Sequence, residues 1–285
     1  MWAIIGGSGF EKSENVQALD LLERETPFGQ ASSGLKRVRV GGVEAIFLPR
    51  HGSEHELLPS EVNYRANIFA LRKHGATRVL AFSAVGSLRP ELAPGMLAVP
   101  AQFIDRTKAQ RQTSFFGAGV VGHVSLAHPV CAACSQFVAG VAKSVDVPCH
   151  IGGTSICIEG PYFSTQAESK VYRSFGADLI GMTSFPEYAL VREAGMCYLP
   201  CFFVTDFDCW DDTIAHVTIQ EVLDVMRKNN IKAYALAAQI LKVTKIAPCQ
   251  CATSGISAGL MTPKEHIPAA AREWLAVLEG GPVLS

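Results

Sequence analysis

The sequence predicts a single α/β domain in which helices flank a mixed, mostly parallel central sheet. Three observations favour this fold class. Short apolar runs alternate with helix-like segments along most of the chain, which is typical of strands joined by helical crossovers. The 285 residues, 48% of them hydrophobic and 18% charged, suffice for one sizeable core. No internal repeat or low-complexity linker divides the chain, so we expect one domain over residues 1–245 and a C-terminal tail over residues 246–285.

The first half of the chain supplies strands that end in glycine-rich or polar turns. Residues 2–5 form an apolar run that leads directly into Gly6-Gly7-Ser8-Gly9, a turn whose backbone N–H groups can surround an anion. We expect further strands at residues 43–48 and 78–82, and between them a helix from about residue 59 to a stop at Lys73-His74-Gly75. Residues 100–130 are predicted to be an irregular excursion.

The second half resumes the alternation of strands and helices. Strands are expected at residues 154–158, 178–181 and 197–204, and helices at residues 166–174 and 187–194. The strongest helical pattern opens with a capping box, and apolar residues then recur on one face. The box is Thr218 with Glu221, and the apolar face is Ile219, Val222, Leu223 and Met226. We expect this helix to break near Asn229-Asn230 and the tail to carry one helix at residues 264–278.

Charge and hydropathy exclude several classes of protein. The chain carries 25 Lys and Arg against 26 Asp and Glu, a net charge of −1 that leaves no basic field for binding nucleic acid. The longest apolar runs fall far short of a membrane-spanning helix, and residues 1–5 lack the basic start of a signal peptide. We therefore expect no membrane contact, and the cysteine content favours a reducing cytoplasm. The low net charge and the mean hydropathy of +0.21 favour apolar surface hidden in an oligomer.

Nine cysteines do not form an obvious disulfide framework, because their number is odd and a chain of this size needs no cross-links. Cys131-x-x-Cys134 and Cys249-x-Cys251 are each a possible redox or metal pair, yet no second C-x-x-C motif or spaced histidine pair completes a four-ligand zinc set. We therefore predict ordinary thiols at the first pair and no metal. The sequence leaves open whether Cys249 and Cys251 form a disulfide.

Polar side chains follow five of the predicted strands. In open parallel sheets, ligands bind outside the carboxyl ends of the strands, so these side chains are expected to converge. The set is Ser8, Arg50, His51, Ser83, Thr183, Asp206 and Asp208. Hydroxyls, backbone N–H groups and one guanidinium suit a small oxyanion such as phosphate or sulfate.

Asp206 and Asp208 differ from the other members of this set because they carry carboxyl groups. They follow an apolar strand at alternate positions, which places both carboxyls on one side if the extended backbone continues. A protonated carboxyl donates to a ring nitrogen, and a neighbouring carboxylate accepts from an exocyclic amine. This pair therefore matches the N7 and N6 edge of adenine and opposes the O6 of hypoxanthine.

Several motifs in the same order, spanning about residues 2–245, give the chain a family resemblance. They are Ile4-Ile5-Gly6-Gly7-Ser8-Gly9-Phe10, Pro49-Arg50-His51-Gly52, Asn63-Tyr64-Arg65-Ala66-Asn67, Gly181-Met182-Thr183 with Pro186-Glu187, and Glu193-Ala194-Gly195. The chain resembles the purine nucleoside phosphorylase/5′-methylthioadenosine phosphorylase family. Thr205-Asp206-Phe207-Asp208-Cys209-Trp210 resembles the methylthioadenosine branch.

The resemblance implies a fold, a reaction and a set of site residues. It implies a homotrimer that cleaves an N-glycosidic bond of 5′-methylthioadenosine with phosphate as co-substrate and with no metal or organic cofactor. It places phosphate among Ser8, Arg50, His51, Ser83, Ala84 and Thr183. The nucleoside contacts are expected from Phe163, Ser164, Met182, Asp206, Asp208, Ile219, Val222 and Leu223, and from His123 of a neighbouring subunit. Asp206 and His51 are the expected catalytic residues, with Asp206 as the general acid at N7.

The sequence departs from the family pattern at a few positions. Tyr162 replaces the usual arginine of a Glu-Gly-Pro-Arg-Phe motif, which leaves the local packing and loop charge open. Ser8 and Ser83 replace threonines but keep the hydroxyl, and residues beyond about 245 have no clear counterpart.

Three alternatives are considered. One is a phosphorylase for 6-oxopurine nucleosides such as methylthioinosine or inosine, which the two aspartates disfavour. Another is a non-catalytic protein that binds nucleosides or aromatic ligands, which the intact Asp206, Arg50 and His51 disfavour. A nicotinamide dinucleotide enzyme is disfavoured because the G-x-G-x-x-G spacing is missing.

Overall fold

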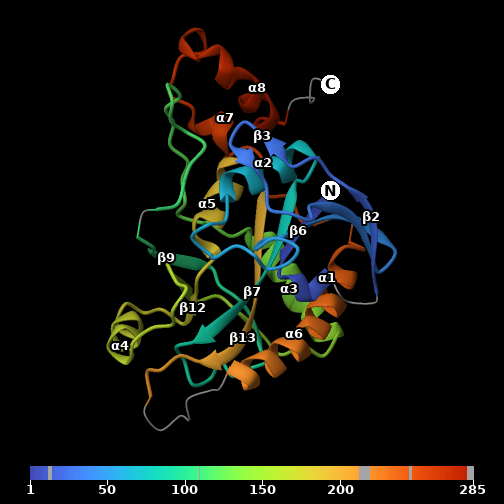
Figure 1. Cartoon of the computed structure of the whole chain (residues 1–285), viewed down its shortest axis with the longest axis vertical. Coiled ribbons are helices and arrows are strands. Elements are labelled where there is room, and N and C mark those ends of the chain that lie inside the picture. The colour runs from blue at the N-terminus through green and yellow to red at the C-terminus, as the bar shows by residue number, and fades with distance from the viewer. Residues whose placement is uncertain (12–14, 109, 212–218, 244–245, 281–285) are drawn as a thin grey trace.

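The computed structural model describes the chain from residue 1 to 280, except residues 12–14, 109, 212–218 and 244–245 and the side chains of residues 8, 11 and 219. One large mixed sheet forms the centre of the molecule (Figure 1). Its main path runs β10-β8-β13-β7-β1-β6-β5-β2, and β12, β11 and β9 continue from β7. Strands β6, β1, β7 and β13 pair with one another in parallel. The pairs of β5 with β2 and β6, of β12 with β7 and of β8 with β13 are antiparallel. The prediction of a mixed, mostly parallel sheet is confirmed.

The strands of this sheet, and a separate two-stranded ribbon of β3 and β4, have the following bounds. They are β1 Trp2–Gly6, β2 Val16–Leu21, β3 Glu25–Thr26, β4 Gly29–Gln30, β5 Lys36–Val40, β6 Val43–Pro49, β7 Arg78–Ser87, β8 Leu97–Val99, β9 Gln102–Arg106, β10 Cys149–Ile151, β11 Thr154–Ile158, β12 Leu179–Gly181 and β13 Cys197–Phe207.

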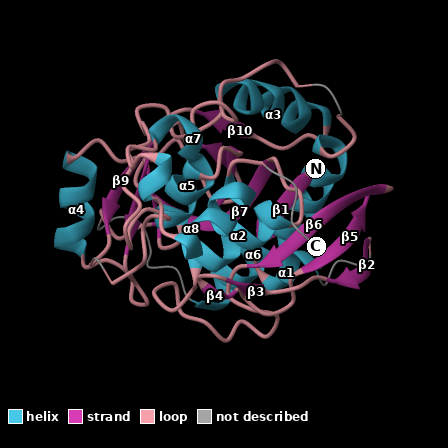
Figure 2. Cartoon of the chain, turned by 90° about the horizontal axis from the view of Figure 1, so that it is seen from above, coloured by secondary structure: helices cyan, strands magenta, loops and turns pink. Residues whose placement is uncertain are grey.

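The described helices cover both faces of the sheet. They are α1 Ser8–Glu11, α2 Tyr64–Lys73, α3 Ala132–Ser144, α4 Gln166–Ser174, α5 Ser184–Glu193, α6 Ile219–Ile240, α7 Ile256–Gly259, the 3₁₀ helix η1 Lys264–His266 and α8 Ala269–Leu278. Figure 1 shows α7 and α8 beside α2 at one end of the molecule and α6 at the other. From above, α4 and the β2–β5 edge lie on opposite sides (Figure 2). None of the described helices has the length and apolar composition that a bilayer crossing needs.

Two large apolar clusters pack on the sheet because strand residues alternate between its faces. One joins residues of β1, β6 and β7 to α2, α5 and α8, and it includes Ile5, Leu71 and Trp274. The other joins the opposite faces of the same strands to α3 and α6, and it includes Ile4 and Leu236. The C-terminal segment thus contributes Trp274 and its neighbours to the same core as the first strands.

Many predicted elements match the structure closely. The strand at residues 154–158 and the helix at residues 166–174 have the expected bounds. The helix begins where Thr165 and Glu168 make a reciprocal capping box, which holds its first turn. The helix predicted from residue 59 begins later, at Tyr64, because the Asn63 side chain accepts the Ala66 N–H at 3.1 Å and caps it.

The predicted break in the long helix is wrong, since α6 runs unbroken through Asn229 and Asn230. The Asn229 amide Nδ2 donates to the Val204 carbonyl at 3.1 Å, so a buried contact with the sheet replaces the expected turn. The predicted capping residue Thr218 lies outside the described residues. The predicted tail helix is split into η1 and α8 at Pro268. The excursion at residues 100–130 contains β9, and α3 was missed altogether.

Candidate active site

A cavity of about 560 Å³ lies at the carboxyl ends of β1, β6, β7 and β13. This is the edge at which the sequence predicts a ligand site. Most of the predicted polar residues meet there. The cavity is lined by Gly7, Arg50, His51, Ser83, Ala84, Gly86, Phe163, Ser164, Met182, Thr183, Asp206, Asp208, Val222, Met226 and others.

Arg50 occupies the end of the cavity predicted to bind an anion, and its charge is already paired. Its Nε and Nη2 donate to the two oxygens of Glu187 at 2.6 and 2.9 Å, and Nη1 donates to the Phe82 carbonyl at 3.0 Å. Both side chains are almost fully buried. Burial opposes the charged form, but the adjacent Glu187 carboxylate raises the pKa of Arg50 above its ordinary value. The guanidinium is therefore rigid and permanently charged, with two N–H donors left.

Glu187 was missed as a functional residue by sequence reasoning. Its Oε1 also accepts the Tyr198 hydroxyl at 3.1 Å, so the carboxylate is held from two elements. Its position in the Pro186-Glu187 motif was visible, but only the fold reveals that it faces Arg50. Because the pair is nearly neutral, the anion end of the cavity is a cluster of dipoles and not a strong cationic site.

Two hydroxyls stand beside this pair. Ser83 Oγ and Thr183 Oγ1 lie 3.3 Å apart. Thr183 precedes α5, yet its hydroxyl does not cap that helix, so it is available to a ligand. Ser83 lies inside β7 and not at its end as predicted, because β12 pairs with Gly86 and Ser87 and extends the strand. Hydroxyls that both donate and accept suit a phosphate oxygen, whether protonated or not.

His51 is neutral in this environment. Burial and the adjacent Arg50 charge lower its pKa to about 4. The ring Nδ1 lies 2.9 Å from the Leu57 carbonyl, which only accepts, so Nδ1 carries the single ring proton. Nε2 is therefore an acceptor. His51 can therefore accept a hydrogen bond from a phosphate or sugar hydroxyl.

Asp206 and Asp208 form the opposite end of the cavity. β13 shifts its register against β7 between Val204 and Asp206, and both carboxyls still line the same cavity, as the alternation predicted. Burial raises the pKa of Asp206; the hydrogen bond from Thr205 Oγ1 at 2.6 Å partly offsets this effect and the Asp208 charge adds to it. Protonation of Asp206 is thereby favoured.

Asp208 is buried and incompletely satisfied. Burial also raises the pKa of its carboxyl, and the nearby Ser169 and Ser164 hydroxyls oppose the rise. Neither hydroxyl makes a hydrogen bond of standard geometry, and within the described chain Asp208 Oδ2 has no hydrogen-bond partner. A buried carboxylate oxygen without a donor is costly, and a ligand amine would supply the missing hydrogen bond.

Arg111 supports the segment that carries the lining residue Met182, and sequence reasoning missed it too. It is buried, its Nε donates to Glu159 at 2.8 Å, and its Nη1 donates to the carbonyls of Met182 and Phe185 at 2.9 and 2.6 Å. It thus ties the excursion around residue 111 to the strand and loop that carry Met182. No local pattern identifies Arg111, because its partners are far away in sequence.

The remaining predicted site residues fall in different places. Phe163 and Ser164 line the cavity, and Phe163 stands at its open side with 72% of its surface exposed. Val222 lines the cavity, but Leu223 is exposed and does not, because it points away from the edge of α6 that carries Val222 and Met226. His123 is exposed and outside the cavity of its own chain. The side chains of Ser8 and Ile219 lie outside the described residues.

Tyr162 does not line the cavity. It is exposed, and its hydroxyl accepts a hydrogen bond from the Lys108 ammonium at 3.3 Å while the ammonium also lies over the ring. The tyrosine therefore keeps a cationic contact on the loop without adding charge to the site.

The α/β fold gathers hydroxyls, a buried guanidinium and two carboxyls with raised pKa values around one cavity, an arrangement typical of an enzyme active site. The family model of the phosphorylase superfamily matches residues 2–242. The chain belongs to the phosphorylase superfamily.

Curated relatives agree with this assignment. The chain is 44% identical over 278 residues to an S-methyl-5′-thioadenosine phosphorylase from Geobacter sulfurreducens, with 97% of each chain covered. It is 45% identical over 254 residues to an enzyme of the same name from Pyrococcus furiosus, with 87% of this chain and 95% of that one covered.

Solved structures show the same fold. A methylthioadenosine phosphorylase from an Antarctic soil metagenomic library has a TM-score of 0.89 and 39% identity, with 97% of this chain and 98% of that one covered. A mutant of the Schistosoma mansoni adenosine/methylthioadenosine phosphorylase in complex with methylthioadenosine has a TM-score of 0.78 and 36% identity, with 84% and 90% covered.

Proposed function

We propose that the protein catalyses phosphorolysis of 5′-methylthioadenosine to adenine and 5-methylthioribose-1-phosphate, as a pentosyltransferase. The observation that carries this proposal is the arrangement of the cavity, in which two pKa-raised carboxyls oppose a cluster of oxyanion donors. The names of the relatives support the same reaction.

The purine end provides the leaving-group chemistry. Protonated Asp206 donates its proton to N7. The base then takes up the electron pair of the breaking C1′–N9 bond and leaves as neutral adenine. Asp208 Oδ2 accepts from the N6 amine, which gives this oxygen its missing hydrogen bond. Hypoxanthine has a carbonyl at this position, and two acceptors would then face each other.

The anion end provides the nucleophile. Phosphate held by Arg50, Ser83 and Thr183 attacks C1′ as the bond to N9 breaks, and its negative charge offsets the oxocarbenium character of the sugar. Gly7 and Ala84 also line the cavity. Neutral His51 accepts a hydrogen bond there through Nε2. Positioning and electrostatics supply the acceleration, and the reaction requires no metal or organic cofactor.

The apolar edge of α6 gives the specificity for the 5′ substituent. Val222 and Met226 line the cavity, and a methylthio group packs against them with a preference over a hydroxyl of roughly 1–3 kcal/mol. Met182 also lines the cavity and is assigned to the ribose.

The assembly belongs to the same proposal. A homotrimer would bring His123 of one subunit to the 5′ end of the neighbouring site, and His123 is exposed and held through its backbone N–H by the Gly259 carbonyl at 2.9 Å. Sedimentation analysis tests the trimer. A cytoplasmic location is favoured by the nine free thiols.

A base-release assay tests the reaction. Purified protein is incubated with 5′-methylthioadenosine or 5′-methylthioinosine, each with and without phosphate. We expect adenine release that depends on phosphate, and little hypoxanthine. Fast hypoxanthine release would overturn the specificity, release without phosphate would indicate a hydrolase, and no release would indicate a binding protein.

A further inference from the structure

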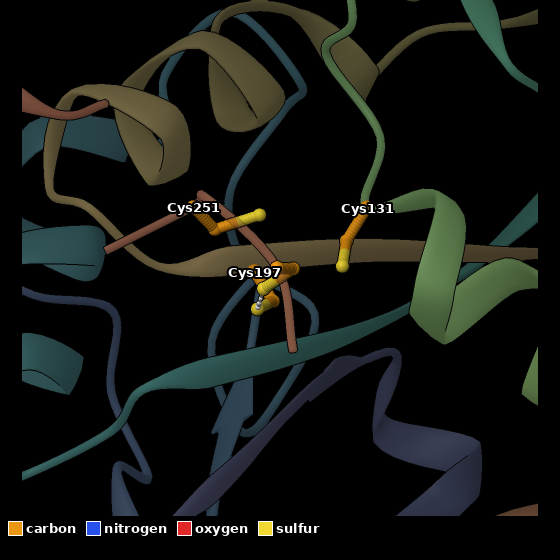
Figure 3. A group of neighbouring side chains, drawn as sticks. Cys131, Cys197 and Cys251 are labelled. Carbon is orange, nitrogen blue, oxygen red and sulfur yellow. Dashed lines mark hydrogen bonds between the residues drawn. The ribbon is translucent and has the colours of Figure 1, made fainter. Parts of the chain in front are cut away.

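Four cysteines gather away from the cavity. The four-cysteine cluster consists of Cys131, Cys197, Cys249 and Cys251, and all four Sγ atoms lie within 4.8 Å of one another. Figure 3 shows the sulfurs of Cys131, Cys197 and Cys251 directed toward a common region from separate segments. Three of the cysteines are buried and Cys249 is exposed, which leaves one side open to solvent.

The fold assembles this cluster from three distant parts of the chain. Cys131 precedes α3, Cys197 opens β13, and Cys249 and Cys251 lie between α6 and α7. The first two are anchored by their backbones: Cys131 N donates to the Tyr198 carbonyl at 3.1 Å, and Cys197 N donates to the Thr77 carbonyl at 3.0 Å. Spacing along the sequence shows no second C-x-x-C motif, but the fold brings Cys197 and the Cys249-x-Cys251 pair to Cys131.

The spacing of the sulfurs matches tetrahedral thiolate coordination. A Zn–S bond of about 2.3 Å places the sulfurs of a tetrahedral site about 3.8 Å apart. The Sγ atoms of Cys197 and Cys249 are 3.4 Å apart, and the others fall within the 4.8 Å limit. All nine cysteines are free thiols, so neither Cys249 nor Cys251 is committed to a disulfide.

A buried cation and a helix N-terminus lie near these sulfurs. Arg192 is 5% exposed, and its positive charge opposes the rise that the neighbouring thiols and burial cause in the pKa of Cys251. Its Nη2 donates to Ser254 Oγ at 2.6 Å, while its Nε has no hydrogen-bond partner and no acidic side chain pairs with it among the described residues. Cys131 stands at the N-terminus of α3, where the helix dipole stabilises an anion.

We propose that the four-cysteine cluster binds one Zn²⁺ ion as a structural site. Each cysteine releases its thiol proton to solvent as its Zn–S bond forms, and no oxidation or reduction takes place. Four thiolates around Zn²⁺ leave a net charge of −2, which Arg192 and the α3 dipole partly offset. Soft thiolate ligands in this geometry select zinc over Mg²⁺ or Ca²⁺.

The site would fasten the C-terminal segment to the sheet. Beyond Cys251 the chain continues into α7, whose Gly259 carbonyl holds the backbone of His123. Zinc therefore stabilises the part of the molecule that α7 and α8 add to the core.

Metal content tests this proposal without reference to catalysis. The full-length chain is purified under reducing conditions, incubated with Zn²⁺ and desalted, and its zinc is measured by mass spectrometry. We expect one zinc ion per chain in the wild type. Cys249→Ser removes an exposed ligand with little cost to packing, and Cys149→Ser is the matched control outside the cluster. The first is expected to weaken zinc binding at least about tenfold and the second to leave it unchanged.

Two further readouts distinguish a real site from adventitious metal. Co²⁺ in place of Zn²⁺ should give the intense visible bands of tetrahedral thiolate coordination in the wild type and in Cys149→Ser only. Chelation should lower the Tm of the wild type by roughly 5–10 °C and leave Cys249→Ser nearly unaffected. The proposal is overturned if the reduced wild type takes up no zinc, if both variants retain it equally, or if Cys197 and Cys249 are found disulfide-bonded in the presence of excess Zn²⁺.

Discussion

The two ends of the cavity treat charge in opposite ways. At the anion end, Arg50 is locked to Glu187 by two short hydrogen bonds and both are buried. At the purine end, Asp206 and Asp208 form no ion pair with any described residue, and burial raises the pKa of each. The contrast teaches that burial has opposite consequences for a paired and an unpaired group. The Glu187 carboxylate keeps the buried Arg50 charged, whereas the carboxyls of Asp206 and Asp208 have no opposite charge beside them and are more readily protonated.

The largest effect on activity is expected at the end of the cavity that carries Asp206 and Asp208. Asp206→Asn keeps the size of the side chain but removes the proton donor at N7, so kcat/KM for 5′-methylthioadenosine should fall about 10²–10⁴-fold. The wild-type activity should also fall as pH rises through the raised pKa of Asp206, because only the protonated form donates. Steady-state adenine release measures both. Asp20→Asn, at an exposed position in β2, is the control; a loss of only a few-fold at Asp206 would contradict the acid role.

At the end of the cavity that carries the Arg50–Glu187 pair, we expect a substitution to lower the stability of the fold. Glu187→Gln leaves the buried Arg50 charge without its carboxylate and should lower the free energy of unfolding by about 3–5 kcal/mol. Urea unfolding measures the change. Glu44→Gln breaks the exposed pair with Arg39 at 2.8 Å and should cost no more than about 1 kcal/mol. Equal losses in the two variants would remove the distinction between a buried pair and a surface pair.

His51 makes the stability of the protein depend on pH. Its folded pKa is about 4 and its ordinary value is 6.5, so the unfolded chain takes up the proton first as pH falls. The stability that neutral His51 contributes is present above pH 6.5 and is lost as pH falls toward 4, by at most about 3 kcal/mol. His51→Gln should flatten this part of the curve of unfolding free energy against pH. Parallel curves for the two proteins would show that the pKa of His51 is not lowered in the folded protein.

The smallest effect should come from one hydroxyl of the anion end. Ser83→Ala removes a phosphate ligand but leaves Thr183 Oγ1 in place, so the KM for phosphate should rise about 5–10-fold, equivalent to about 1 kcal/mol. The kcat at saturating phosphate should change little, in contrast to Asp206→Asn. A fall in kcat with an unchanged KM would instead assign Ser83 to the transition state.

Local sequence patterns were enough to predict many of the strands and helices. Apolar runs predicted the central strands, and the helix predicted at residues 166–174 has the bounds of α4. The polar residues after those strands could be assigned to one site, since the carboxyl ends of parallel strands share an edge. Helix α3 was missed because its sequence mixes small, polar and apolar residues.

What the sequence by itself determined was the fold class and the edge of the sheet at which the cavity lies, because each depends on patterns over a few neighbouring residues. Only the tertiary structure decided which groups are paired and which are left free. It placed Glu187 against Arg50, directed the only ring proton of His51 to Leu57, and brought four cysteines from three segments together. Charge state and ligand geometry depend on contacts between distant residues and on burial, and neither is encoded in local spacing.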